Sequence, residues 1–421
     1  PPQTAGPPGP AEHPAPRALR SRGIAPANPG GRVTVVSGIP GKPELFYVAG
    51  AAGGIFKTTN GGVTFAPIFD DQPVASIGAI EIPASNENIL WVGTGEGDPR
   101  NSTSFGNGVY RSTDAGRTWA YLGLEDTERI KRIAVDPANP DVALVCALRH
   151  AWRPNEQRGV FRTRDAGRTW QKVLYRDQDT GCSDIAMEPG NPRTMYAGMY
   201  TFRRRPWRFD SGGKETALYK TTDGGDTWQK VTGGGMPTEP MDRIGMGVSM
   251  SNPNVVYMIT ETKTQGVLFR SEDRGATWTM VNNSTQLSFR PFYYCDLRVD
   301  PNNPNRVFVL AGGLNVSDDG GPTFRGASNG VHGDHQALWI DPKNSNRILS
   351  GSDGGFQISW DGSQSWEILN TVWFAQFYRI ETDKVDHAVP AGILACEERR
   401  PRRRRMRRDR RVQHAMVRRF Q

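Results

Sequence analysis

The residues of this sequence that are best suited to chemistry lie in three segments rich in carboxylates, guanidinium groups and aromatic rings. Residues 95–100 combine two acids with an arginine, residues 148–158 carry arginine and tryptophan, and residues 202–210 interleave arginine with aromatic side chains. Such neighbours suit sugars or peptides, through apolar contact with a ring face and charge-assisted hydrogen bonds. The alternative is that they are solvated loop residues joined by local salt bridges. The binding candidates from these segments are Glu96, Arg100, Arg149, Trp152, Arg204 and Trp207.

A fourth candidate segment is His332-Gly333-Asp334-His335. Two imidazoles and a carboxylate at this spacing resemble part of a metal site. A third and a fourth ligand are not identifiable, so the segment favours a hydrogen-bonded structural pair. We therefore predict no metal and no cofactor.

Hydrolysis of a glycosidic bond needs two carboxylates, about 5 to 9.5 Å apart, on either side of the bond. The catalytic candidates are Glu96, Asp98 and Asp334, and Asp242 and Asp353 could also reach the same face. The sequence does not choose a pair among them. No nucleophile elbow, P-loop or dinucleotide fingerprint is found.

The elements that position these residues follow from an internal repeat. An eight-residue pattern, Ser/Thr-x-Asp-x-Gly-x-Ser/Thr-aromatic, begins every 42 to 58 residues; we call each copy an Asp box. Asn60 replaces the aspartate in the first copy and Ser363 replaces the glycine in the last. The copies span residues 58–65, 112–119, 163–170, 221–228, 271–278, 317–324 and 359–366.

The residue types of the Asp box fit a tight hairpin turn. The carboxylate can accept backbone N–H groups, the glycine supplies a positive φ, and the aromatic ring is expected to pack against the sheet. These side chains are therefore predicted to be structural and not catalytic. They are Asn60, Asp114, Asp165, Asp223, Asp273, Asp319 and Asp361.

A second repeat, of the form apolar-x-apolar-Asp/Glu-Pro-x-Asn, lies upstream of several boxes, as at 133–140, 185–192, 297–304 and 338–344. Each repeating unit then reads as inner strand, Asn-Pro turn, second strand, loop, third strand, Asp box and fourth strand. Four-stranded units at this period indicate a propeller. The sequence therefore predicts an all-β chain folded as a β-propeller, with seven blades of four antiparallel strands.

Domain boundaries follow from the extent of the repeats. Residues 21–383 are assigned to the propeller, residues 1–20 to a disordered linker or remnant, and residues 384–421 to an unstructured arginine-rich tail. Residues 377–383 resemble the first strand of a further unit, which either closes the ring or opens another domain.

The strand order divides the loops between two faces, because successive turns of an antiparallel meander alternate ends. Asn-Pro turns and Asp boxes share one face. Links between blades and second-to-third-strand loops share the other, where the loop lengths vary and where binding is expected. His332, Asp334 and His335 should lie there at the mouth of the central channel, beside Arg129 and Arg243, which completes the set of binding candidates.

The net charge of +8 resides in the tail, because residues 397–421 hold twelve arginines and three acids, which leaves −1 for the remainder. A nucleic-acid groove on the propeller is thus not predicted, and only the tail could bind nucleic acid. No apolar run is long enough to span a membrane, and no signal peptide is seen. The four cysteines are far apart, which argues against a zinc site or a disulfide framework.

The Asp boxes, with VGTGE at 92–96, GGIFKT at 53–58, DHQALWIDP at 334–342 and DGG at 353–355, resemble those of bacterial Asp-box (BNR-repeat) proteins related to the sortilin N-terminal domain. They are also similar to the propellers of xyloglucan-cleaving hydrolases and, more distantly, of sialidases. The resemblance covers residues 21–383 and implies a secreted or periplasmic protein. No loop matches the hydrolases residue by residue, so their catalytic residues are not carried over.

The function that these observations predict is an exported propeller that binds a glycan or a polypeptide on its loop face. The alternatives are a glycoside hydrolase that uses two loop carboxylates, and a scaffold for protein assembly. The resembling proteins continue with a GGLQDNG-like segment where this chain enters residues 385–421, so we attribute the tail to a frameshift or truncation; resequencing tests this.

Overall fold

The computed structural model describes residues 31–100, 103–148, 150–372, 377–382 and 390–394. The chain divides into two compact units, with the boundary between Gln376 and Phe377. In the second unit, β30 (Phe377–Thr382) and β31 (Pro390–Leu394) form a two-stranded antiparallel sheet. One strand thus lies within the segment 384–421, for which the sequence predicted no structure. The boundaries predicted at Ser21 and Asp383 lie outside the described residues.

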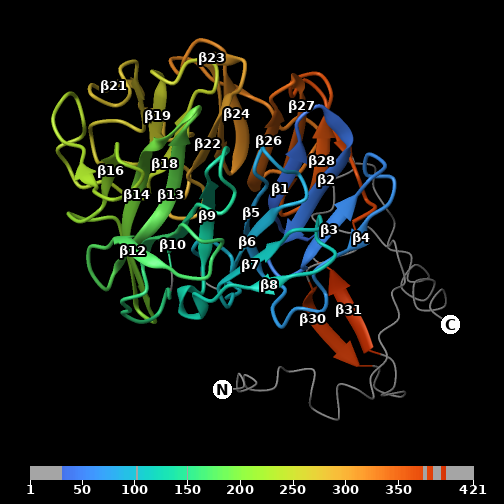
Figure 1. The fold of residues 1–421 in the computed structure, drawn as a ribbon. Coiled ribbons are helices and arrows are strands. Elements are labelled where there is room, and N and C mark those ends of the chain that lie inside the picture. The colour runs from blue at the N-terminus through green and yellow to red at the C-terminus, as the bar shows by residue number, and fades with distance from the viewer. Residues whose placement is uncertain (1–30, 101–102, 149, 373–376, 383–389, 395–421) are drawn as a thin grey trace, which may run out of the picture. The chain divides into compact units, whose positions relative to one another are not determined.

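The first unit is a seven-bladed β-propeller, as predicted (Figure 1). Each blade is an antiparallel sheet whose strands follow one another in the chain, and β15 (Arg208–Ser211) extends β14 in the fourth blade. Among the described residues the only helical element is a 3-10 turn, Glu125–Thr127. No helix in the described part of the chain is long and apolar enough to cross a membrane.

The four strands of each blade run in chain order from the channel outward. Blades one to four are β1 (Val33–Ile39), β2 (Lys42–Gly50), β3 (Ile55–Thr58), β4 (Ala66–Pro67); β5 (Ile77–Glu81), β6 (Leu90–Thr94), β7 (Val109–Ser112), β8 (Ala120–Tyr121); β9 (Ile130–Val135), β10 (Ala143–Ala147), β11 (Gly159–Thr163), β12 (Gln171–Leu174); and β13 (Thr180–Glu188), β14 (Asn191–Arg205), β16 (Ala217–Thr221), β17 (Gln229–Lys230). Blades five to seven are β18 (Gly245–Val248), β19 (Val256–Ile259), β20 (Leu268–Ser271), β21 (Thr279–Asn282); β22 (Asp296–Asp300), β23 (Asn303–Ala311), β24 (Gly313–Ser317), β25 (Arg325–Gly326); and β26 (His335–Asp341), β27 (Asn344–Ser352), β28 (Gly355–Ser359), β29 (Glu367–Ile368).

The Asp boxes are the turns between the third and fourth strands. In the third box, Asp165 accepts the backbone N–H of Thr169 at 2.9 Å and the hydroxyl of Thr163 at 2.8 Å. The Thr163 hydroxyl oxygen in turn accepts the N–H of Gly167 at 2.9 Å. The glycine has a φ of 88°, and Ser363 keeps a φ of 74° at the same position of the last box. The turn thus requires a positive φ whichever residue occupies the position.

The hydrophobic core lies between the blades. Seven clusters of buried apolar residues each join two neighbouring blades, including the last blade and the first. The box tryptophans reinforce these interfaces: the indole N–H groups of Trp119, Trp170 and Trp366 donate to carbonyls of the preceding blade at 2.6 to 2.8 Å. Each blade therefore depends on its neighbour for burial of its faces.

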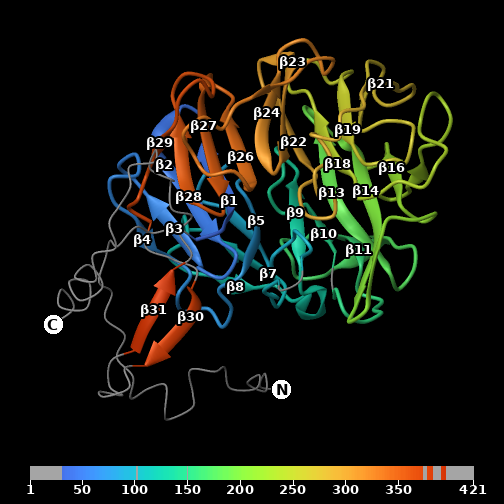
Figure 2. The same cartoon turned by 180° about the vertical axis from the view of Figure 1, so that it is seen from behind.

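The ring closes directly between the seventh blade and the first. β1 lies against β26, and both views show the last blade beside the first (Figures 1 and 2). All four strands of each of these blades come from one contiguous segment, so no strand is exchanged across the closure. The Asn-Pro turns and Asp boxes share one face, the turn face, and the other loops share the opposite loop face.

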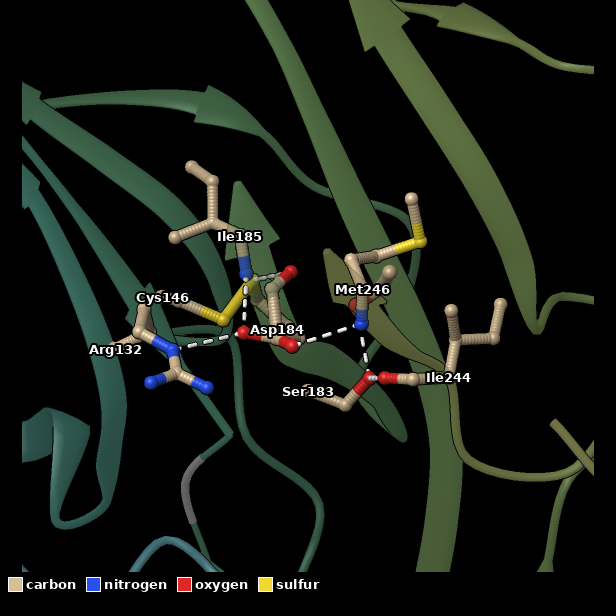
Figure 3. The surroundings of a disulfide bond; sticks show 9 residues. Arg132, Cys146, Ser183, Asp184, Ile185, Ile244 and Met246 are labelled. Carbon is tan, nitrogen blue, oxygen red and sulfur yellow. Dashed lines mark hydrogen bonds and ion pairs between the residues drawn. A yellow bond between two sulfur atoms is a disulfide. The ribbon is translucent and has the colours of Figure 1, made fainter. Parts of the chain in front are cut away.

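Cys146 of β10 and Cys182 of β13 form a disulfide between the third and fourth blades, so the expectation of no disulfide was wrong. The two residues are 36 positions apart, but each lies on a strand of the interface between these blades. Figure 3 shows the adjacent network, in which the Asp184 carboxylate accepts from Arg132 Nε and from the backbone N–H of Met246, each at 2.9 Å. Three consecutive blades are thereby joined at the channel wall.

Candidate functional site

The candidate site is the loop-face mouth of the central channel, where the inner strands begin. The links that enter β1, β9, β18, β22 and β26 bring their last residues to this mouth, because every inner strand runs in the same direction. The long loop between β6 and β7 covers the second blade and supplies the acids of the segment 95–100. The site is therefore built from residues that are far apart in the chain.

Arg32 joins two acids of the mouth. Its Nη1 lies 2.5 Å from Glu96 Oε1 and its Nε lies 3.1 Å from Asp353 Oδ1, so one guanidinium links the first, second and seventh blades. C–N bonds of about 1.33 Å fix the size of a guanidinium, so these two oxygens are at most about 8 Å apart. Burial raises the pKa of Glu96 to about 7 despite Arg32, and burial also raises the pKa of Asp353. Glu96 can therefore exist as a neutral acid near pH 7.

Asp98 belongs to a separate buried ion cluster. Its Oδ1 lies 2.7 Å from both Lys131 Nζ and Arg243 Nη2, and all three side chains are nearly inaccessible. Burial opposes the charge on Asp98, but the two cations outweigh it and lower its pKa. Arg243 also donates to the carbonyls of Phe292 and Tyr293. This geometry fits an anchor for the loops and leaves Asp98 unsuited to exchange protons with a substrate.

Arg100 is exposed to solvent at this mouth, and Asp353 is also partly exposed, at 20%. The Arg100 side chain is 27% exposed, its Nη1 is 3.9 Å from Asp353 Oδ2, and its guanidinium lies over the Tyr293 ring at 5.5 Å. Gln336 Nε2 donates to the Tyr293 hydroxyl at 2.9 Å and to Asp353 Oδ1 at 3.2 Å. Arg100 thus presents donors to solvent from a fixed position.

The remaining predicted residues of the mouth lie outside these two clusters. Arg129 pairs with Glu128 at 3.1 Å, and His332 Nδ1 contacts the Gly333 carbonyl at 2.8 Å. His335 is buried against the Ser350 hydroxyl, and burial lowers its pKa to about 4. Within the described residues no group of three or more His, Cys, Asp or Glu could hold a metal ion.

Asp334 has a left-handed φ of 55° and accepts a hydrogen bond from Tyr294. Its backbone carbonyl accepts hydrogen bonds from the Asp353 N–H at 3.2 Å and from Gln336 Nε2 at 3.3 Å, so Asp334 adjoins the cluster around Arg32. Arg149 lies outside the described residues.

Four exposed aromatic side chains lie in loops of the loop face, from the second blade to the link that enters the sixth, and we call them the aromatic rim. Phe105 lies in the β6–β7 loop, Trp152 in the β10–β11 loop, Trp207 at the tip of the β14–β15 hairpin, and Phe289 in the link from β21 to β22. Their exposed fractions are 68%, 53%, 80% and 52%. Four exposed aromatic rings on one face make that face a candidate contact surface.

The hairpin that carries Trp207 is held by contacts at its base. The Arg204 guanidinium lies 4.2 Å from the centre of the Phe209 ring and 5.7 Å from that of Phe292. The backbone N–H of Arg204 donates to the Ala151 carbonyl at 2.7 Å, which ties the hairpin to the loop that carries Trp152. Arg204 is therefore a positioning residue, and the two tryptophans stand on joined elements.

Sequence reasoning missed Arg32, Lys131, Tyr293 and Gln336 in the mouth, and Phe105 and Phe289 in the rim. Arg32, Lys131 and Gln336 lie just before or within the first two residues of an inner strand. This position was a signal that sequence reasoning could have used for the first, third and seventh blades.

Fold and site together define a seven-bladed β-propeller with Asp-box turns, a polar channel mouth, and exposed aromatic side chains on the same face. Residues 107–265 match the family model described as Sortilin-Vps10, sortilin, neurotensin receptor 3. The chain is thus similar to sortilin-like, BNR-type propellers, in agreement with the resemblance seen in its motifs.

Known relatives extend this likeness. The chain is 29% identical to xyloglucanase Xgh74A of Acetivibrio thermocellus over 330 residues, 67% of this chain and 36% of the relative. The GH74 xyloglucanase structure of Xanthomonas campestris superposes with a TM-score of 0.62 at 18% identity, over 86% of this chain and 58% of that one. The structure of YCF48 bound to D1 peptide has a TM-score of 0.52 at 16% identity, over 79% and 94%. The chain spans 40% or less of each of these curated xyloglucanases.

Proposed function

We propose that this propeller binds a polysaccharide across its loop face, with the aromatic rim as the contact surface. The observation that carries the proposal is the exposure of Phe105, Trp152, Trp207 and Phe289 on that one face. Sugar rings have apolar faces that pack on aromatic rings, while their hydroxyl groups accept hydrogen bonds from arginines such as Arg100. The xyloglucanases among the relatives make xyloglucan the first polysaccharide to test.

The second candidate function is hydrolysis of a glycosidic bond by Glu96 and Asp353. Their separation of at most about 8 Å is compatible with an acid and base pair. A pKa of about 7 suits Glu96 to donate a proton near neutral pH. However, the Glu96 side chain is only 1% exposed and shares Arg32 with Asp353, so substrate has no direct access to it. Binding is therefore the better supported function.

The proposal is tested by measuring the affinity of the full chain for xyloglucan oligosaccharides with calorimetry. We expect Trp207→Ala and Trp152→Ala each to weaken binding about tenfold, because truncating an exposed anchor removes more than about 1 kcal/mol of contact energy. Trp360→Ala is the matched control, since this tryptophan is 49% exposed in the last Asp box on the opposite face. If all three variants lost the same affinity, or if none of them lost affinity, a binding site on the rim would be contradicted.

The same samples separate the alternatives. Release of reducing ends that is lost in Glu96→Gln, and kept in the turn-face control Glu87→Gln, would establish hydrolysis. Binding without release supports the proposed function. Absence of both signals across a panel of polysaccharides would instead point to a polypeptide partner, as in an assembly scaffold.

We further propose that the protein works outside the cytosol, in a secreted or periplasmic form. The Cys146–Cys182 disulfide supports this, because disulfides persist mainly in oxidising compartments. Detection of the native chain by fractionation of the source cells, with its thiols blocked at lysis, tests the assignment. Recovery from the cytosol with both cysteines reduced would contradict it.

A further inference from the structure

The central channel contains a cavity of about 790 Å³ that none of the functions above uses. It is lined by the inner strands β1, β5, β9, β22 and β26, and by turn-face residues that include Pro40, Asn86 and Lys343. The cavity therefore runs along the channel from Lys131 and Gln336, near the loop-face mouth, to the turn face, where Lys343 lies. Its volume is in the range of small-molecule sites, about 300 to 1,000 Å³.

Two guanidinium groups give the cavity its chemical character. Arg132 Nη2 lies 3.1 Å from Asp296 Oδ1, and Arg298 also pairs with Asp296 and donates from Nε to the Leu338 carbonyl. Both arginine side chains keep about a quarter of their surface exposed, at 25% and 23%, whereas Asp296 is 7% exposed. Among the described residues no partner is seen for Arg132 Nη1, and Figure 3 shows only its Nε directed at Asp184. Cationic donors thus face the cavity while their carboxylate partner is enclosed.

The side chains that line the cavity are basic in excess, although acids behind the wall offset this excess. Five basic and three acidic side chains line it: Lys42, Lys131, Arg132, Arg298 and Lys343 against Glu81, Glu87 and Asp296. Asp98 and Asp184 pair with Lys131 and Arg132 from behind the wall, which makes the formal charges equal, five against five. The attraction for an anion therefore rests on the positions of three groups: Arg132 Nη1, the exposed Lys343, and Glu81, whose pKa burial raises to about 7.

We propose that this cavity binds a small molecule through an oxyanion, a carboxylate or phosphate group, held between Arg132 and Arg298. Asp184 and Asp296 already accept from most of the guanidinium donors, so the N–H groups left for the ligand are those of Arg132 Nη1 and the second N–H of Arg298 Nη2. Hydrogen bonds from a guanidinium to an oxyanion are charge-assisted and strong. The half-buried indole of Trp339 and the carboxyl group of Glu81 complete a pocket suited to a sugar-sized body with hydroxyl groups. A sugar acid and a sugar phosphate share this chemistry, and the test distinguishes them.

Binding should weaken as pH rises. The charged groups that face Glu81 are Arg132 of β9 and Arg298 of β22, and both stay protonated over the accessible range. Glu81 is therefore the group that titrates near neutrality. Below its pKa it is neutral and can donate to the ligand, and above it a carboxylate repels the anion.

The test is calorimetric titration of the full chain with glucuronate, inorganic phosphate and glucose at constant ionic strength, at pH 6 and pH 8. We expect glucuronate, phosphate or both to bind more tightly at pH 6, and glucose not to bind. Arg298→Gln should weaken binding about tenfold or more, because a charged hydrogen bond is lost. Arg325→Gln is the matched control: it lies in the same blade, is 48% exposed, and is outside the cavity.

Two results would overturn the proposal. One is absence of binding by both anions at pH 6, and the other is equal affinity in the Arg298→Gln and Arg325→Gln variants. Should Arg298→Gln fail to fold, Lys343→Gln at the exposed entrance replaces it, with an expected loss of about threefold. The comparison of the two pH values on the unmodified chain stands in either case.

Discussion

At the scale of single residues, the first Asp box shows what the repeated carboxylate does. Asn60 accepts the N–H of Thr64 at 3.0 Å, as the aspartates do, but its Nδ2 donates to the Thr64 hydroxyl, which reverses one hydrogen bond. In the other boxes the threonine or serine hydroxyl donates to the carboxylate, as Thr277 does to Asp273 at 2.6 Å. An amide therefore closes the same turn as a carboxylate, which fits a structural role.

We predict that Asp273→Asn lowers the melting temperature at pH 7 only slightly, on the order of 2 °C. Hydrogen bonds from the Thr277 hydroxyl, and to a smaller extent from the Thr277 backbone N–H, lower the pKa of Asp273 to about 2. The stabilisation by this carboxylate is thus present above the unfolded pKa near 4 and is lost as pH falls toward 2. Between pH 7 and pH 2 the melting temperature should fall less in Asp273→Asn than in the unmodified chain, and it should fall more in Asn60→Asp. Identical acid profiles in the two variants would contradict this origin.

At the scale of elements, the interface between the third and fourth blades combines three kinds of contact. An apolar cluster that includes Leu144, Val160 and Met195 surrounds the Cys146–Cys182 disulfide. The Arg132–Asp184 ion pair joins the same two blades beside the channel. In the unfolded chain the disulfide still holds these two segments together. It thereby lowers the conformational entropy of the unfolded state, which is the main way in which such bonds stabilise a fold.

Reduction should therefore destabilise the propeller. We expect a reducing agent to lower the free energy of unfolding by about 2 to 4 kcal/mol, as for loops of this size. Urea unfolding with and without reductant measures the change. In the Cys146→Ala/Cys182→Ala variant the reductant should have no effect, and a remaining effect would contradict this origin of the stabilisation.

At the scale of the whole molecule, the closure of the ring rests on side chains and not on a shared strand. Asp341 of the last blade accepts the backbone N–H of Gly41 in the first blade at 3.1 Å and pairs with Arg347 at 3.0 Å. Arg347 also donates to the Pro43 carbonyl, and the Thr371 hydroxyl donates to the Gly62 carbonyl. Apolar packing between the two blades completes the closure.

We predict that Asp341→Ala lowers the free energy of unfolding by about 3 kcal/mol, because it leaves the buried Arg347 without its carboxylate. Hydrogen exchange should accelerate first in β1 and β26. Asp300→Ala is the matched control, since Asp300 holds the same position one blade earlier but contacts the neutral hydroxyl of Ser345. If Asp300→Ala lowered the free energy of unfolding as much as Asp341→Ala, the role given to the ion pair would be contradicted.

The fold could be predicted because its signals are local. An Asp box and an Asn-Pro turn each lie within eight residues, and seven copies at a regular period indicate seven blades. The mouth of the channel could not be assembled in this way, since Arg32 meets Glu96 across 64 positions and Asp353 across 321. Glu96 and Asp353 were predicted to reach the loop face, but their shared partner Arg32 was not identified. The disulfide was missed for the same reason, because its cysteines face each other only across packed blades.

The outermost strands of the blades have a consequence for solubility. Five of the seven, β4, β8, β17, β25 and β29, are two residues long, and β12 and β21 have four residues each. A long free edge offers unpaired N–H and C=O groups to another chain and so promotes aggregation. Around the circumference of this propeller such edges are too short to template a sheet. The ring can thus expose seven sheet edges to solvent without inviting edge-to-edge association.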